Sequence, residues 1–170
     1  KAIKDQMLAL PEKIQKTLEN QEEIKKFAKQ YSGVKDVFFL GRGLDSAVAM
    51  EGSLKLKEIS YIHSDAYAAG ELKHGPIALI EKGTIVIAIM AQQALYEKML
   101  NNVKEVKARG AYVFAIAKEG HKEVEEISDQ VLFIPEVPDL LTPVVAVVPL
   151  QLLAYYMAVE KGCDVDKPRN

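Results

Sequence analysis

The pattern of apolar positions changes once along the chain. Up to residue 32, apolar side chains recur at roughly helical spacing among Lys and Glu, at Ile14, Leu18, Ile24 and Phe27. Pro11 suits the first turn of a helix, and Ser32-Gly33 ends the run. We therefore expect a helical lead-in over residues 1–32.

Beyond this lead-in, short apolar segments rich in β-branched and aromatic residues alternate with helical stretches. The predicted strands are Val34–Leu40, Tyr61–His63, Thr84–Met90, Ala111–Ala117 and Gln130–Ile134. The predicted helices are Asp45–Ile59, Gln93–Arg109, a brief His121–Ile127, and Thr142–Lys161. Near-continuous apolar strands indicate a parallel sheet that is covered on both faces.

This alternation predicts an α/β fold of the flavodoxin-like or Rossmann-like kind. We expect a three-layer sandwich with a roughly five-stranded parallel sheet flanked by helices. Residues 1–170 form one domain in this interpretation, with the sheet and helices in 33–162 and a tail in 163–170. The length of 170 residues agrees with a single domain.

Composition and charge narrow the functional classes. The 22 basic and 24 acidic residues give a net charge of -2, so a nucleic-acid-binding surface is not expected. A single cysteine, Cys163, excludes an internal disulfide and fits a reducing, cytoplasmic setting. The longest apolar stretch, Pro143–Val159, is interrupted by Pro149 and Gln151 and is short for a membrane span, so we expect no membrane partner.

A glycine-containing turn after the first strand is the first candidate ligand site. Gly41-Arg42-Gly43 could bind phosphate, and Asp65 could bind a ribose, as in a dinucleotide-binding domain. Ser46 occupies the place where that fingerprint has its third glycine. A tight strand-to-helix turn without any ligand explains two glycines equally well.

The helix predicted over 45–59 carries three charged residues that are a more informative candidate site than the glycine turn. On a helical projection, Glu51, Lys55 and Glu58 fall on the same side as an apolar stripe at Leu44, Ala47, Val48, Leu54 and Ile59. Charges within an apolar stripe require either a wet cleft or mutual pairing. One interpretation is a solvated Glu51–Lys55 pair. The other is a partly desolvated carboxylate suited to proton abstraction.

The histidines supply a second candidate. His74 precedes Gly75-Pro76, a rigid turn that would project the ring rather than bury it. We expect His121 in an exposed loop and His63 packed and hydrogen-bonded at a strand end. No Cys/His cluster has metal-ligand spacing and no nucleophile motif appears, so neither a metal, nor another cofactor, nor hydrolase chemistry is expected. The nearly all-apolar helix 142–161 indicates a core or subunit interface, hence a homo-oligomer.

Two long runs, Glu51–His63 and Ala66–Pro76, closely resemble the SIS (sugar isomerase) domain family. Within it, the chain resembles the carboxy-terminal lobe of the glutamine–fructose-6-phosphate aminotransferases, or glucosamine-6-phosphate synthases. Val148–Tyr155 and Gly162–Asn170 continue the likeness, which covers essentially the whole chain.

The resemblance implies isomerisation of fructose 6-phosphate to glucosamine 6-phosphate, with a proton moved between C1 and C2. It implies that Glu58 is the enolisation base and His74 the ring-opening group, with Lys55 and Glu51 in supporting catalytic roles. It also implies a homodimer that shares the histidine, a preceding SIS lobe, and a glutaminase domain.

Three departures from the family pattern accompany the likeness. Residue 1 is a lysine where the family's glutaminase domain begins with cysteine, no Ser/Thr-rich phosphate loop occurs, and the chain stops at Asn170 before the family's Schiff-base lysine, which Lys167 is not. We therefore expect a truncated lobe that is inactive alone. The alternatives are a non-catalytic SIS module that binds phosphosugars as a regulator, and a dinucleotide-binding domain.

Overall fold

The sheet of the computed structural model, which describes residues 2–169, contains five parallel strands in the order β2-β1-β3-β4-β5. The strands are β1 (Asp36–Gly41), β2 (His63–Ala68), β3 (Ile85–Met90), β4 (Tyr112–Lys118) and β5 (Gln130–Ile134). The strand order reverses between β1 and β3, and ligands of open α/β sheets bind at the carboxyl ends of strands beside such a switch.

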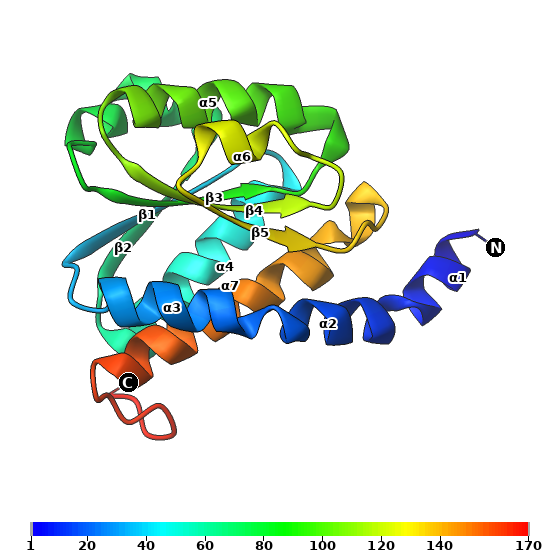
Figure 1. Ribbon diagram of the computed structural model, residues 1–170, viewed down its shortest axis with the longest axis horizontal. Helices are drawn as coiled ribbons and strands as arrows, with labels where there is room; N and C mark the ends of the chain where they lie inside the picture. Colours follow the sequence, from blue (N-terminus) through cyan, green and yellow to red (C-terminus); the bar gives the residue numbers. More distant parts are fainter. Residues whose placement is uncertain (1, 170) are drawn as a thin grey trace.

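Helices cover both faces of this sheet, as Figure 1 shows. Before β1 come α1 (Ala2–Leu8), α2 (Leu10–Glu19) and α3 (Gln21–Tyr31). The later helices are α4 (Leu44–Ser60), α5 (Tyr96–Ala108), α6 (Val124–Ile127) and α7 (Thr142–Glu160). Short 3-10 segments are η1 (Ala69–His74), η2 (Pro76–Leu79), η3 (Gln93–Leu95) and η4 (Asp139–Leu141).

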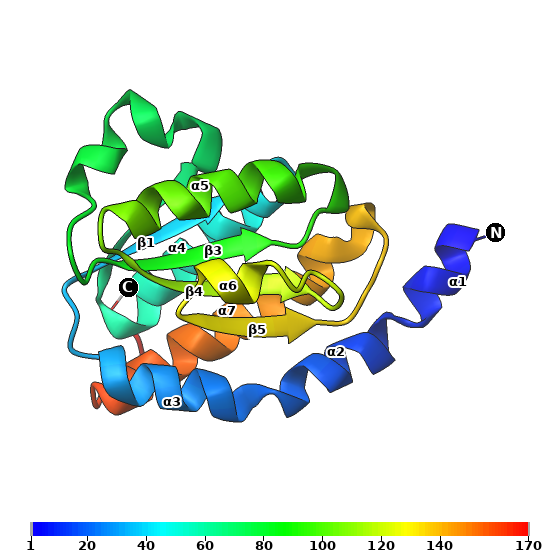
Figure 2. The ribbon, with the colours of Figure 1, turned by 45° about the horizontal axis from the view of Figure 1, so that its top comes forward.

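Two apolar cores lie on opposite sides of the sheet. The first joins α3, α4 and α7 to one face and contains Phe27, Phe39, Leu56 and Leu150. The second joins α5, α6 and η1 to the other face and contains Phe38, Leu72, Val103 and Val124. Figure 2 shows η1 and η2 beside α5, where a crossover helix would otherwise lie between β2 and β3. The predicted three-layer α/β sandwich is thus confirmed.

The second strand was predicted in the wrong place. The helix before it runs to Ser60, Tyr61 adopts a left-handed conformation, and the strand starts at His63, where the prediction ended it. Within residues 2–169, β2 is an edge strand that pairs with β1 alone. Its buried side chain Ser64 is polar, with its hydroxyl 3.0 Å from that of Ser53. Edge strands need no continuous apolar run, so the apolar pattern missed it.

The buried face of α4 is also not the predicted one. Its buried residues are Asp45, Val48, Ala49, Gly52, Ser53, Leu56 and Ser60, whereas Leu44 and Leu54 remain 39% and 44% exposed. Small residues face the core because α7 packs closely against α4 there. The stripe is therefore only partly buried, with Val48 enclosed and Leu44 and Leu54 exposed, and the three charged residues lie beside its exposed part.

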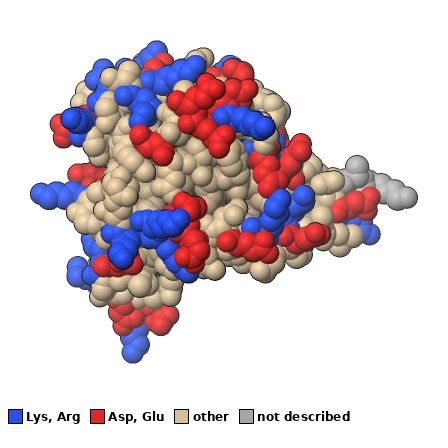
Figure 3. Space-filling model, viewed as in Figure 1, with Lys and Arg blue, Asp and Glu red and all other residues tan. Residues whose placement is uncertain are grey.

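The last helix is apolar almost all round, and the segment Asp139–Glu160 is long and apolar enough to cross a membrane. This length corrects the expectation of a segment too short for a membrane span, but half of its apolar part is buried within the fold. α7 packs against α2, α3 and α4, as a core helix does. On the described surface drawn in Figure 3, acidic and basic side chains are interspersed, and no broad basic area appears.

Candidate functional site

Three charged side chains meet on the second half of α4. Lys55 Nζ lies 2.6 Å from Glu58 Oε2 and 3.8 Å from Glu51 Oε1. These contacts follow from helix geometry, because residues three and four apart are neighbours on one helix face. The side chains of Lys55, Glu58 and Glu51 are 33%, 29% and 41% exposed, so the cluster is partly shielded from water but open to it.

The environment keeps Lys55 protonated. The hydrogen bond that its ammonium donates to Glu58 raises the pKa of Lys55 above 10.5, against the opposing effect of burial, and the charges of both glutamates add to the rise. Lys55 is therefore a fixed cation at neutral pH and not a proton acceptor. Its position between two carboxylates orients Glu58, and among the described residues no hydrogen bond reaches the second carboxylate oxygen of Glu58.

Two open cavities adjoin this cluster. One, of about 520 Å³, is lined by Glu51 together with Met50, Leu54, Lys57 and Asp65 among others. The other, of about 370 Å³, is lined by Leu54, Lys57, Glu58, Tyr61 and Arg169. Glu51 and Glu58 thus face neighbouring hollows that share Leu54 and Lys57.

His74 lies apart from the three helix residues. It ends η1 and is followed by Gly75, whose φ of 148° favours glycine, and by Pro76. The ring is 74% exposed, and its Nε2 is 3.9 Å from Glu71 Oε2. Among the described residues, no hydrogen bond or ion pair links His74 to the Glu51–Lys55–Glu58 cluster, so one copy of the chain does not assemble all four predicted site residues.

The glycine turn after β1 does not offer a free phosphate site. The amide of Leu44 donates to Gln92 Oε1 at 2.6 Å, so a protein side chain already occupies the start of α4. Arg42 donates to Asn102 at 3.0 Å, and Asp65 accepts a hydrogen bond from Tyr67 at 3.2 Å. The groups that a dinucleotide would need already have partners within the protein, so these contacts disfavour the dinucleotide-binding alternative.

The sequence did not predict a buried polar network that lies beside that turn. Asp45 is 1% exposed and accepts the amide hydrogens of Ala91 and Gln92 at 2.8 and 3.1 Å. Lys118, 5% exposed, donates to Asp139 at 2.9 Å. A charged residue at a helix start or strand end is usually exposed, so the sequence carries no signal for this burial.

Two histidine expectations are wrong in part. His121 is buried rather than exposed. Its ring stacks on that of Tyr96, with the two ring centres 3.8 Å apart, and its Nε2 lies 2.8 Å from Gln93 Oε1. Burial and the charge of Lys118 lower the pKa of His121. His63 has the expected hydrogen bond, to Asp36 at 2.8 Å, but its side chain is 66% exposed and not packed.

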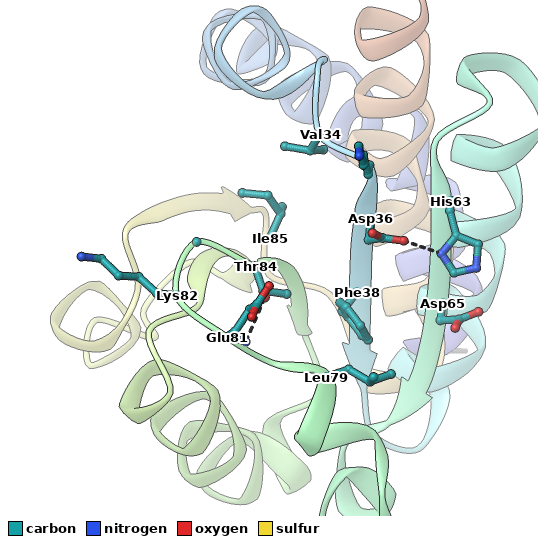
Figure 4. A pocket seen from close by; sticks show the side chains of 12 residues that line it. Val34, Asp36, Phe38, His63, Asp65, Leu79, Glu81, Lys82, Thr84 and Ile85 are labelled. Atoms are coloured by element: carbon teal, nitrogen blue, oxygen red, sulfur yellow. Dashed lines mark hydrogen bonds and ion pairs between the residues drawn. The ribbon is translucent and has the colours of Figure 1, made fainter.

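Another cavity, of about 440 Å³, opens at the amino ends of β1 and β3. Figure 4 shows the Asp36–His63 pair on one side of it and Leu79, Glu81 and Thr84 on the other. None of the four predicted site residues lines it. In the described part of the chain, no group of three or more His, Cys, Asp or Glu side chains is placed to hold a metal ion.

The order of strands, the two-sided helical cover and the charged end of α4 agree with a family match. A family model described as the SIS domain matches residues 30–161. The chain belongs to the SIS domain family. The match spans every strand of the sheet and all four predicted site residues.

Relatives of this SIS domain are much longer than the chain. Those from Caldanaerobacter subterraneus subsp. tengcongensis and Clostridium acetobutylicum, both named glutamine–fructose-6-phosphate aminotransferase (isomerizing), are 65% and 61% identical over 168 residues. Each match covers 99% of the chain but 28% of the relative. The chain thus spans under a third of their length.

Solved structures agree with the SIS fold. The C-terminal domain of glucosamine-fructose-6-phosphate aminotransferase from Francisella tularensis is 42% identical with a TM-score of 0.83, covering 91% of this chain and 43% of that one. A putative tagatose-6-phosphate ketose/aldose isomerase from Clostridium novyi, 22% identical, has a TM-score of 0.83 and covers 95% of this chain and 43% of that one. The latter likeness shows the fold alone.

Proposed function

We propose that the chain is the isomerase lobe of a glutamine–fructose-6-phosphate aminotransferase, with Glu58 as the base that moves a proton between C1 and C2 of the sugar. The observation that carries this proposal is the ion pair of 2.6 Å between Lys55 and Glu58 beside an open cavity. A carboxylate held at one oxygen by an ammonium keeps its second oxygen available for a substrate C–H proton. Identity of 65% to a relative with that name supports the substrate class, sugar 6-phosphates.

The supporting residues take roles that follow from their charges. In this proposal the Lys55 ammonium orients Glu58 and stabilises the negative charge that develops on an enolamine-like intermediate. Glu51, at 3.8 Å from Lys55, limits the rotation of the lysine. We propose that residues 1–170 act as one SIS unit in the cytoplasm, alongside a preceding SIS lobe and a glutaminase domain.

His74 lies apart from the Glu58 cluster of its own chain, so a catalytic role for it requires the site of another chain. Its ring is 74% exposed, and no hydrogen bond or ion pair joins it to Glu58 among the described residues, so we propose that it opens the sugar ring in the site of a second copy within a homodimer. Exposed apolar side chains could be buried in such a dimer interface, notably Met50 and Leu54 on α4 and Tyr155 and Val159 on α7.

The base is tested in the full-length natural protein that contains this chain. We expect Glu58→Gln to lower the ammonia-dependent formation of glucosamine 6-phosphate from fructose 6-phosphate by roughly 10²-fold or more in kcat. Glu160→Gln, at the exposed end of α7, is the matched control and should leave the rate unchanged. Unchanged turnover in Glu58→Gln would show that Glu58 is not the base, whereas sugar-phosphate binding without turnover in the wild-type protein would support the non-catalytic phosphosugar-binding module.

Mixed dimers test the shared histidine. Glu58→Gln and His74→Ala chains are each expected to be inactive as homodimers. In a mixed dimer, one site would combine an intact Glu58 with an intact His74, so random mixing should restore about a quarter of the wild-type activity. No recovery after verified subunit exchange would contradict a histidine contributed across the interface.

A further inference from the structure

The chain after α7 folds back onto the end of α4. The Cys163 thiol lies 3.9 Å from the Ser60 carbonyl oxygen. The Asp164 carboxylate accepts amide hydrogens from Asp166 and Lys167 at 3.1 and 3.2 Å, which closes a local turn. The tail 163–169 therefore has a defined path although most of its side chains are exposed.

Tyr61 contacts the far end of this tail in two ways. Its hydroxyl oxygen accepts the Arg169 amide hydrogen at 3.1 Å, and the Arg169 guanidinium lies 4.2 Å from the centre of its ring. Among the described non-glycine residues, Tyr61 alone has a positive φ, at 59°. Glycine or asparagine usually occupies such a position at a helix end. A strained tyrosine there indicates that its side chain is needed.

This contact brings the tail to the cavity of the candidate base. Arg169 and Tyr61 line the same cavity of about 370 Å³ as Glu58, which lies one helical turn before Tyr61. We propose that Tyr61 is a positioning residue that holds segment 163–169 in place, so that the Arg169 guanidinium forms a positively charged wall of the Glu58 cavity. The catalytic part of this inference rests on the proposed function, whereas the placement of the tail does not.

The wall matters because Arg169 stays charged at every physiological pH and its planar fork stacks on an aromatic ring. The charged groups around Glu58 are then Lys55, Lys57 and Arg169, with Glu51 beyond Lys55. A tail held in this way excludes water from one side of the cavity and supplies a cation for the negative charge that develops as the bound sugar reacts. Loss of the contact should lower kcat, because the wall is needed after the substrate has bound.

The placement of the tail is tested in the 170-residue chain by amide exchange at Arg169 and by the reaction rate of Cys163, its single thiol, with a thiol reagent. We expect Tyr61→Phe, which keeps the ring and loses the acceptor, to speed exchange at Arg169 about fivefold. Tyr61→Leu, which loses both contacts, should speed exchange and thiol reaction about tenfold or more. Tyr155→Phe, whose half-exposed ring lies on α7, is the control. Wild-type rates of Arg169 amide exchange and of Cys163 reaction in both Tyr61 variants would overturn the inference.

Kinetics of the full-length protein test the catalytic part. We expect Tyr61→Leu to lower kcat about tenfold with KM changed less than threefold, and Tyr61→Phe to retain most of kcat. Tyr61→Asn keeps a residue that tolerates the left-handed helix end, so a loss of kcat with an unchanged unfolding midpoint separates positioning from fold stability. Wild-type kinetics in Tyr61→Leu would overturn the catalytic role. If Glu58→Gln is fully active, the proposed function fails, and the tail measurements still decide the placement.

Discussion

Asp45 gives the sharpest prediction about stability, because it is a carboxyl group buried at the switch point of the sheet. Its Oδ2 accepts two amide hydrogens, whereas Oδ1 is buried without a partner among the described residues. Burial raises the pKa of Asp45 to about 6, against the effect of the two amides; the charge of Asp139 adds to the rise and that of Lys118 opposes it. The unpartnered oxygen is where the proton of the neutral acid would sit.

The magnitude follows from linkage between protonation and folding. The ordinary pKa of the side chain is 3.8, and a difference of about 2.2 corresponds to ~3 kcal/mol at 1.36 kcal/mol per unit. Below pH 3.8 both states are protonated and there is no penalty. As pH rises towards 6, the unfolded chain releases the proton first, so the free energy of unfolding falls. Between pH 4.5 and 7.5, about 2 kcal/mol of this loss should appear.

Asp45→Asn removes the ionisation and keeps an oxygen that can accept both amide hydrogens. We expect the stability of the variant relative to wild type to rise by about 2 kcal/mol between pH 4.5 and 7.5. Urea unfolding at several pH values measures this difference, and groups common to both proteins cancel. Asp166→Asn, at an exposed tail position, is the control and should show no such trend. Parallel stability curves for wild type and Asp45→Asn would refute the reasoning.

The remaining predictions concern packing and the second buried charge. Gly52→Ala should destabilise the fold by about 1–3 kcal/mol in urea, because the added Cβ would lie 2.7 Å from Leu150 Cδ1. Gly33→Ala has no atom within 4 Å of the new Cβ, and a loss as large as that of Gly52→Ala would contradict the steric explanation. Lys118→Met should lower the free energy of unfolding by about 1–3 kcal/mol, because Asp139 loses its ammonium donor; an unchanged urea midpoint would show that the pair adds nothing.

Local patterns accounted for most of the fold. β5 was predicted with its observed bounds, and β1, β3, β4 and α7 were each predicted within two residues at either end. The proximity of Glu51, Lys55 and Glu58 also followed from spacing, since it depends only on the helical repeat. β2 was misplaced because an edge strand with a buried serine carries no apolar run to mark it.

The sequence by itself determined the succession of strands and helices and the charged cluster on α4, because both depend on contacts between residues close along the chain. Only the tertiary structure decided which face of α4 is buried, since that depends on how closely α7 approaches Gly52. It likewise decided that Asp45 and His121 are enclosed and that His74 lies apart from Glu58. These outcomes depend on segments distant in sequence, and local periodicity holds no information about which distant surface covers a given side chain.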